Sequence, residues 1–197
     1  MRKADLLNLI KFCLDEVTLQ MVNHQGIHFI MHSRLKFEKW FQVELLKTLI
    51  ISTNKISNIQ LKNEYPVSSK KSKKGETIDL VILSNSEKLA GIELKVVPTN
   101  YESEGFTKST KGITDTINEM INDLDKPIND GYEHSFSIGL IFPFPLDPNH
   151  RNNLKDFSKQ ETKLSIAGEM YIHPCKISKI FNAKYYIVSK SNLRLNI

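Results

Sequence analysis

The stretch from Glu76 to Val97, ETIDLVILSNSEKLAGIELKVV, decides the fold of this chain. It contains two runs of strand-forming residues, ETIDLVIL and KLAGIELKVV, which are separated by the polar residues SNSE. Two such runs joined by a short polar loop predict a β-hairpin. Folding the hairpin symmetrically about Ser86 predicts three opposed pairs: Leu83 with Leu89, Val81 with Gly91, and Asp79 with Glu93.

Two carboxylates in this hairpin interrupt otherwise apolar runs. Residues opposed in a ladder have Cβ atoms roughly 4.5 to 5.5 Å apart, so Asp79 and Glu93 are expected to lie side by side. Like charges at that distance repel, and a divalent cation such as Mg²⁺, which binds one or two carboxylates, removes the repulsion. Lys95 follows Glu93 by two residues, and this spacing returns its side chain to the same strand face.

The residues before the hairpin predict two helices and a strand. A helix from Ala4 to Val22 and a second helix that begins at Ser33, its N-cap, follow from apolar spacing. The first helix buries one stripe: Leu6, Ile10, Cys13, Leu14, Val17 and Met21. The second carries another stripe: Phe37, Trp40, Phe41, Glu44, Leu45, Thr48 and Leu49. The run IQLKNEYPV, residues 59–67, then predicts a strand.

The residues after the hairpin return to alternating helices and strands. Helical spacing covers Thr110 to Leu124, and Pro127 is expected to stop that helix. The expected later elements are a buried strand over 135–142, a short helix over 151–160, and strands over 169–173 and 185–189. This order predicts a single α/β domain over residues 1–197, with a mixed central sheet flanked by helices.

The spacing of the charged residues resembles a known signature. Asp79, thirteen intervening residues and then Glu93, Leu94 and Lys95 are similar to the PD-(D/E)xK motif of restriction-endonuclease-like nucleases, although Ile78 replaces the nominal proline. The expected order of elements also resembles the core of that family, which is a helix, a three-strand meander, a helix and a strand. The resemblance implies a nuclease core over about 34–142, to which the helix 4–22 and residues 143–197 are additions.

The resemblance also implies roles for individual residues. Asp79, Glu93 and the backbone carbonyl of Leu94 would bind Mg²⁺, or Mn²⁺ in its place, and Lys95 would orient or help deprotonate the attacking water. Glu44 would be the acid that many members carry on the first core helix. Glu38, six residues earlier, would take that place if the helix is rotated. The implied activity is endonucleolytic cleavage of DNA that leaves 5′-phosphate and 3′-hydroxyl ends, in an enzyme that is often a homodimer.

The charge of the chain fits a polyanionic partner but does not require one. The formal net charge is +5 at pH 7 and the pI is about 9.1. A basic loop, SSKKSKKG, directly precedes the strand that contains Asp79. Lysines that cluster beside a reaction centre favour binding of a phosphate backbone. The expected DNA-binding lysines are Lys70, Lys71, Lys73, Lys74, Lys108 and Lys111.

Other patterns point to less specific sites or exclude whole classes of protein. His24, His28 and His32 have the spacing of metal ligands on a helix, but Gly26 interrupts the segment and no second ligand cluster accompanies them.

Neither a P-loop nor a GxGxxG motif is present, so no nucleotide cofactor is expected. No apolar run approaches the roughly 20 residues that cross a membrane. Two cysteines without a CxxC pair fit the reducing cytoplasm.

Three readings of the charged hairpin stay open at this point. Asp79, Glu93 and Lys95 could be an ordinary polar stripe on a sheet. A non-catalytic module that binds nucleic acid or protein could keep the same fold. An RNA-cutting relative could use the same site, because the reaction centre contacts only the phosphodiester.

Overall fold

The computed structural model of this protein describes residues 1–23, 34–68, 75–98, 112–145, 155–176 and 181–192. The helices are α1 (Lys3–Asn23), α3 (Arg34–Thr53), α4 (Ile113–Asp123), α5 (Asp125–Asn129) and α6 (Lys155–Ala167). The strands are β1 (Ile59–Pro66), β2 (Thr77–Ser84), β3 (Glu87–Pro98), β4 (His134–Pro145), β5 (Glu169–Lys176) and β6 (Phe181–Ser191). None of the helices in these ranges is long and apolar enough to cross a membrane.

The strands form one mixed sheet with the order β1-β2-β3-β4-β6-β5. The first three strands are an antiparallel meander, and β4 returns parallel to β3 after α4 and α5. Strand β6 then pairs antiparallel with both β4 and β5. A parallel neighbour requires a crossover connection, which the segment containing α4 and α5 supplies.

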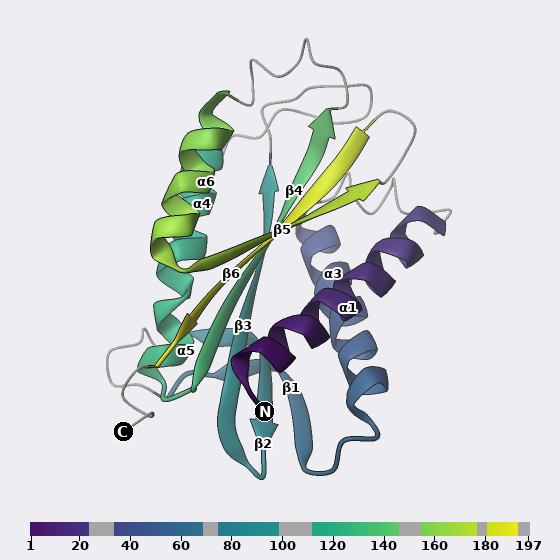
Figure 1. Ribbon diagram of the computed structural model, residues 1–197, viewed down its shortest axis with the longest axis vertical. Coiled ribbons are helices and arrows are strands. Elements are labelled where there is room, and N and C mark those ends of the chain that lie inside the picture. The colour runs from purple at the N-terminus through teal and green to yellow at the C-terminus, as the bar shows by residue number, and fades with distance from the viewer. Residues whose placement is uncertain (24–33, 69–74, 99–111, 146–154, 177–180, 193–197) are drawn as a thin grey trace.

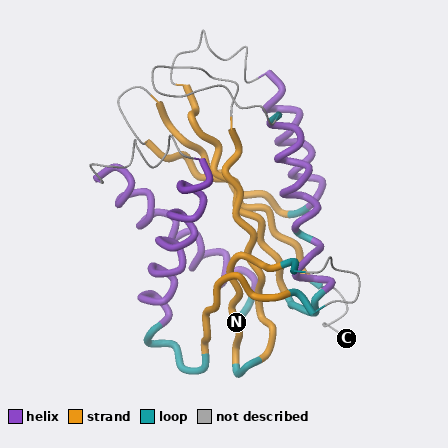
Figure 2. The backbone as a smooth tube through the Cα atoms, turned by 180° about the vertical axis from the view of Figure 1, so that it is seen from behind, coloured by secondary structure: helices purple, strands orange, loops and turns teal. Residues whose placement is uncertain are grey.

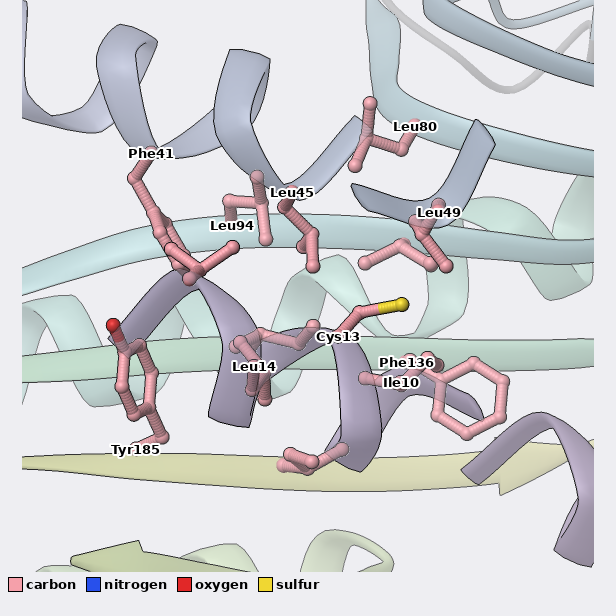
Figure 3. Packing of buried hydrophobic residues seen from close by; sticks show 14 of the residues in the cluster. Ile10, Cys13, Leu14, Phe41, Leu45, Leu49, Leu80, Leu94, Phe136 and Tyr185 are labelled. Carbon is pink, nitrogen blue, oxygen red and sulfur yellow. The ribbon is translucent and has the colours of Figure 1, made fainter. Parts of the chain in front are cut away.

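The sheet has helices on both faces, with α1 and α3 on one side and α4 and α6 on the other (Figure 1, Figure 2). Helices α1 and α3 bury the larger apolar core against the sheet. In Figure 3, Leu14 from α1 and Leu45 from α3 lie close to Leu94 from β3. These three side chains are completely buried. Close packing of this kind is what the stripes of the two N-terminal helices predict.

Two glycines let the helices of the opposite face approach the sheet closely. A Cβ atom on Gly91 would lie 2.5 Å from the Cβ of Pro127, which is in α5. A Cβ atom on Gly139 would lie 2.5 Å from the sulfur of Met120, which is in α4. Both distances are far shorter than van der Waals contact. Helices α4 and α5 can therefore pack this close to the sheet only because these two positions have no side chain.

The α/β class and the mixed sheet with flanking helices are confirmed. The helix expected from Ala4 to Val22 is α1, and each of its six apolar residues is buried. The meander, the buried strand over 135–142 and the last two strands are also present. Ser33, the expected N-cap, lies outside the described residues. Helix α6 continues to Ala167, seven residues beyond its expected end at residue 160.

The hairpin register differs from the symmetric prediction near the turn. Val81 pairs with Gly91 as predicted, but Leu83 pairs with Lys88, because a β-bulge follows Ile82 and leaves Leu89 out of the ladder. The turn itself consists of Asn85 and Ser86, which both have positive φ, as a type I′ hairpin turn requires.

The helix predicted to end at Leu124 is α4, which ends at Asp123, ahead of Pro127. Pro127 itself is the third residue of the next helix, α5. Proline is tolerated there, because the first turn of a helix has no intrahelical partner for the missing N–H.

Candidate metal-dependent site at the fork between β2 and β3

The candidate site lies where β2 and β3 separate. The ladder between them ends at the pair Leu80–Ile92, whereas β3 continues to Pro98 along β4. Asp79 is therefore one residue beyond the last pair, next to Glu93. The amide groups of β3 that β2 no longer covers must bond elsewhere, since an unpaired backbone group in a folded interior is costly.

The side chain of Asp79 accepts a hydrogen bond from one of these amide groups. Its Oδ2 accepts a hydrogen bond from the N–H of Leu94 at 2.8 Å. Its backbone carbonyl accepts a bond from the Nε2 of Gln42 on α3 at 2.9 Å. In an antiparallel strand the N–H and C=O of one residue face the same neighbour. The Leu94 carbonyl therefore faces the fork, on the same edge as the Asp79 carboxylate.

Glu93 is the most deeply buried charged side chain of the site, with 2% of its side chain exposed. Its Oε1 accepts a hydrogen bond from the Nζ of Lys126 at 2.8 Å. Burial, followed by the negative charge of Asp79, raises the pKa of Glu93 to about 8, even though Lys126 acts in the opposite direction. The Asp79 and Glu93 carboxylates are thus close enough to repel each other.

Lys95 lies on the same strand face as Glu93 and is 25% exposed. Its Nζ lies 3.3 Å from the Oδ2 of Asp123, the last residue of α4. Burial acts to lower the pKa of Lys95, but the charge and hydrogen bond of Asp123 outweigh burial and raise the pKa. Lys95 is therefore a stable ammonium group at neutral pH, suited to hold an anion and not to accept a proton.

The acid that α3 contributes to the fork is Glu38, not Glu44. The Oε2 of Glu38 accepts a hydrogen bond from the N–H of Val96 at 3.2 Å, and its charge interacts with Lys95 and Asp79. Burial raises the pKa of Glu38, which is the main effect, although the Val96 bond and Lys95 oppose it. Glu44 instead pairs with Lys47 on its own helix at 3.0 Å. The prediction of Glu44 is corrected because α3 is rotated so that Glu38 and Gln42 face the fork.

Sequence reasoning missed two residues of the site, Asp123 and Lys126. Lys126 links Glu93 to Asp123, because its Nζ lies 2.8 Å from the Oε1 of Glu93 and 3.4 Å from the Oδ1 of Asp123. The only local signal was an acid and a lysine three residues apart at the expected helix end, a pattern that is common on solvated surfaces.

Several predicted residues cannot be placed. The lysines expected to bind DNA, Lys70, Lys71, Lys73, Lys74, Lys108 and Lys111, lie outside the described residues, as do His24, His28 and His32. The first residue of the basic loop, Ser68, is held by Asp130. The N–H and the hydroxyl of Ser68 both donate to Asp130 at 2.6 Å. Gly75, the last residue of the loop, lies two residues before β2, the strand that contains Asp79.

The donors at the fork fit a hard divalent cation. Asp79, Glu93 and the Leu94 carbonyl are oxygen ligands, and Mg²⁺ uses one or two carboxylates and completes its shell with water and phosphate oxygens. Burial and the charge of Asp79 raise the pKa of Glu93, and a cation bound beside these carboxylates would oppose both effects. Within the described ranges, no three His, Cys, Asp or Glu side chains are grouped so that they could hold a metal ion. A cation at the fork would therefore need water or substrate oxygens besides Asp79, Glu93 and the Leu94 carbonyl.

Comparisons with protein-family models, with curated proteins and with solved structures find no match to this chain. The geometry of the fork and the physical chemistry of its residues therefore carry the functional interpretation.

Proposed function

We propose that this chain is a divalent-metal-dependent phosphodiester hydrolase of the PD-(D/E)xK type that cuts DNA. The observation that carries the proposal is the position of Asp79 beside Glu93 at a fork in the sheet, with Lys95 on the same strand face. The order of helix α3, the meander, the crossover helices and parallel β4 is also the order expected of a restriction-endonuclease-like core.

The residues of the fork would divide the work between metal binding and substrate binding. Asp79, Glu93 and the Leu94 carbonyl would hold Mg²⁺, or Mn²⁺ in its place, with Glu38 behind them as the acid from α3. A divalent cation held by these residues would supply hydroxide from bound water and would stabilise the charge on the leaving oxygen.

Lys95 would act through its charge. Because Asp123 keeps Lys95 protonated, the ammonium group would orient the attacking water and stabilise the charge that develops on the phosphate. Asp123 is a positioning residue in this scheme, since it holds Lys95 on the strand face that Glu93 shares. The lysines of the loop before β2 would bind the phosphate backbone of the substrate.

A non-catalytic binding module is the second candidate, and one observation favours it. Glu93 and Lys95 already have ion-pair partners, Lys126 and Asp123, so the fork is electrostatically compensated without a metal. A protein that uses the fold only for binding would have the same internal pairs.

Cleavage assays distinguish these candidates. The purified protein would be incubated with supercoiled plasmid, single-stranded DNA and RNA, in Mg²⁺, Mn²⁺ or EDTA. We expect metal-dependent cutting of DNA that falls at least about a hundredfold in Lys95→Ala. Lys62→Ala removes an exposed lysine of β1 and is the matched control, which should cut at the wild-type rate.

Each other outcome has a clear meaning. Cutting of RNA alone would assign the substrate to the RNA-cutting alternative. Binding without cutting, equal in wild type and Lys95→Ala, would reject the enzyme and support the binding module.

A further inference from the structure

Among the charged residues of the fork described above, Lys126 has no role in the proposed reaction. It belongs to the short helix α5, and its side chain is 15% exposed. Its ammonium group donates hydrogen bonds to the Oε1 of Glu93 at 2.8 Å and to the carbonyl of Thr77 at 3.3 Å. It also forms an ion pair with the Oδ1 of Asp123 at 3.4 Å, so two carboxylates compensate its charge.

The position of Lys126 is set by the backbone around it. The next residue, Pro127, packs on Gly91, where an added Cβ would collide with the proline ring. This contact seats α5 directly over β3, two residues before Glu93. The lysine therefore reaches Glu93 because the strand has a glycine at that point, and its placement is not that of a solvated surface chain.

Lys126 also blocks the carboxylate that the metal would need. Glu93 is 2% exposed, and the shortest ion pair of its carboxylate is the one with Lys126. A divalent cation at Asp79 and Glu93 would stand beside this ammonium group, and two cations at such a distance repel each other strongly in a protein site. Asp123 offers Lys126 a second anionic partner outside the metal ligands.

We propose that Lys126 is a built-in counter-cation that occupies Glu93 while the site is empty and that a divalent cation must displace it. This inference rests on the proposed function, because it assumes that Asp79 and Glu93 bind a metal. It adds a regulatory element: the lysine neutralises buried carboxylates before metal binding, and it sets the metal concentration that the site requires.

The first test measures Mn²⁺ binding by isothermal titration calorimetry, without any substrate. Lys126→Met removes the competing charge and keeps a side chain of similar length, so the affinity for Mn²⁺ should rise at least about tenfold. Lys190→Met is the matched control. Lys190 pairs with Asp125, the neighbour of Lys126 in α5, through an exposed contact of 2.6 Å, and its loss should leave the Mn²⁺ affinity unchanged.

The second test uses the wild-type chain, so it does not depend on the folding of a variant. Lysine acylation followed by mass spectrometry would report the reactivity of Lys126 with and without Mn²⁺. We expect the modification of Lys126 to increase severalfold in Mn²⁺, because the displaced ammonium group leaves its acceptors, whereas Lys190 should react at the same rate in both conditions.

The outcomes separate this inference from the proposed function. If wild type and a folded Lys126→Met bind Mn²⁺ with equal affinity, or if Mn²⁺ leaves the reactivity of Lys126 unchanged, Lys126 is not a competitor and only the inference fails. If neither protein binds Mn²⁺, the metal site itself is refuted and the inference is rejected with it.

Discussion

The two faces of β3 carry opposite kinds of residue, although both are covered by helices. Ile92 and Leu94 point into the apolar core beneath α1 and α3, whereas Glu93 and Lys95 meet Asp123 and Lys126 from α4 and α5. Apolar burial stabilises the fold at roughly 25 cal/mol per Å². Buried ion pairs often contribute little, because their desolvation offsets their attraction. The difference indicates that Ile92 and Leu94 stabilise the fold, whereas Glu93 and Lys95 contribute less to stability and are available for the proposed reaction.

The largest expected effect compares neighbours on the two faces of β3. Leu94→Ala should lower the free energy of unfolding by about 2 to 5 kcal/mol, because Leu94 is completely buried and the truncation leaves a cavity. Glu93→Gln should change it by less than about 1 kcal/mol without metal, because burial and Asp79 raise the pKa of Glu93, so the folded state already disfavours its charged form. Urea unfolding in EDTA measures both, and equal losses would contradict the distinction between the faces.

A smaller loss is expected where α5 meets the sheet. Gly91→Ala places a Cβ 2.5 Å from Pro127, so α5 must shift and stability should fall by about 1 to 3 kcal/mol. Gly112→Ala is the control, since its added Cβ would meet only Asp115 at an ordinary 3.5 Å. Thermal unfolding of both variants tests this, and an unchanged Gly91→Ala would mean that α5 is not held against β3.

Asp130 is a second buried carboxylate, and unlike Glu93 its hydrogen bonds stabilise its charged form. Asp130 accepts bonds from Ser68 and from Lys88, with the Lys88 Nζ at 2.7 Å. Burial acts to raise the pKa of Asp130, but these bonds outweigh burial and lower the pKa below its ordinary value of 3.8. Its contribution is therefore complete above about pH 4 and is lost as the pH falls through the lowered pKa of the folded state.

This acid dependence can be measured with one substitution. Asp130→Asn should cost about 1.5 kcal/mol at pH 7, because it removes charged hydrogen bonds. Urea unfolding between pH 2 and 7 should show that the cost shrinks toward pH 2. A cost that stays constant across this range would mean that the charge of Asp130 does not stabilise the fold.

The smallest effect distinguishes the two acids of α3. Glu38→Gln should slow metal-dependent cleavage about tenfold, which corresponds to about 1.4 kcal/mol in the barrier. Glu44→Gln should leave the rate unchanged, because Glu44 pairs with Lys47 on its own helix. Initial rates of plasmid cleavage measure both variants, and the reverse order would restore Glu44 as the acid of the site.

The sequence predicted the strands well because their patterns are local. Alternation along β3 correctly separated Glu93 and Lys95 from Leu94, and the register at Val81 and Gly91 was right. The prediction reached this register although its turn, centred on Ser86, was wrong. The actual two-residue turn shifts the pairing by one, and the bulge at Leu89 shifts it back. A bulge depends on packing against the rest of the sheet, which no local pattern records.

The rotation of α3 and the role of α5 could not be predicted from the sequence. Helix α3 also has apolar residues on its solvent side, with Val43 58% and Ile51 62% exposed, so its hydrophobic pattern does not define one face. Lys126 meets Glu93 across 33 residues of sequence, and the contact depends on how Pro127 fits onto Gly91. Such contacts are products of tertiary packing.

Asp79→Asn tests the central claim most directly. The change removes the negative charge at the fork but keeps the size of the side chain and an oxygen that can accept the Leu94 N–H. In Mg²⁺, wild-type protein should convert supercoiled plasmid to cut forms, and Asp79→Asn, with an unchanged melting temperature, should be slower by at least about a hundredfold. Equal cutting by the two proteins, or no cutting by wild type, would contradict the metal-dependent site at the fork.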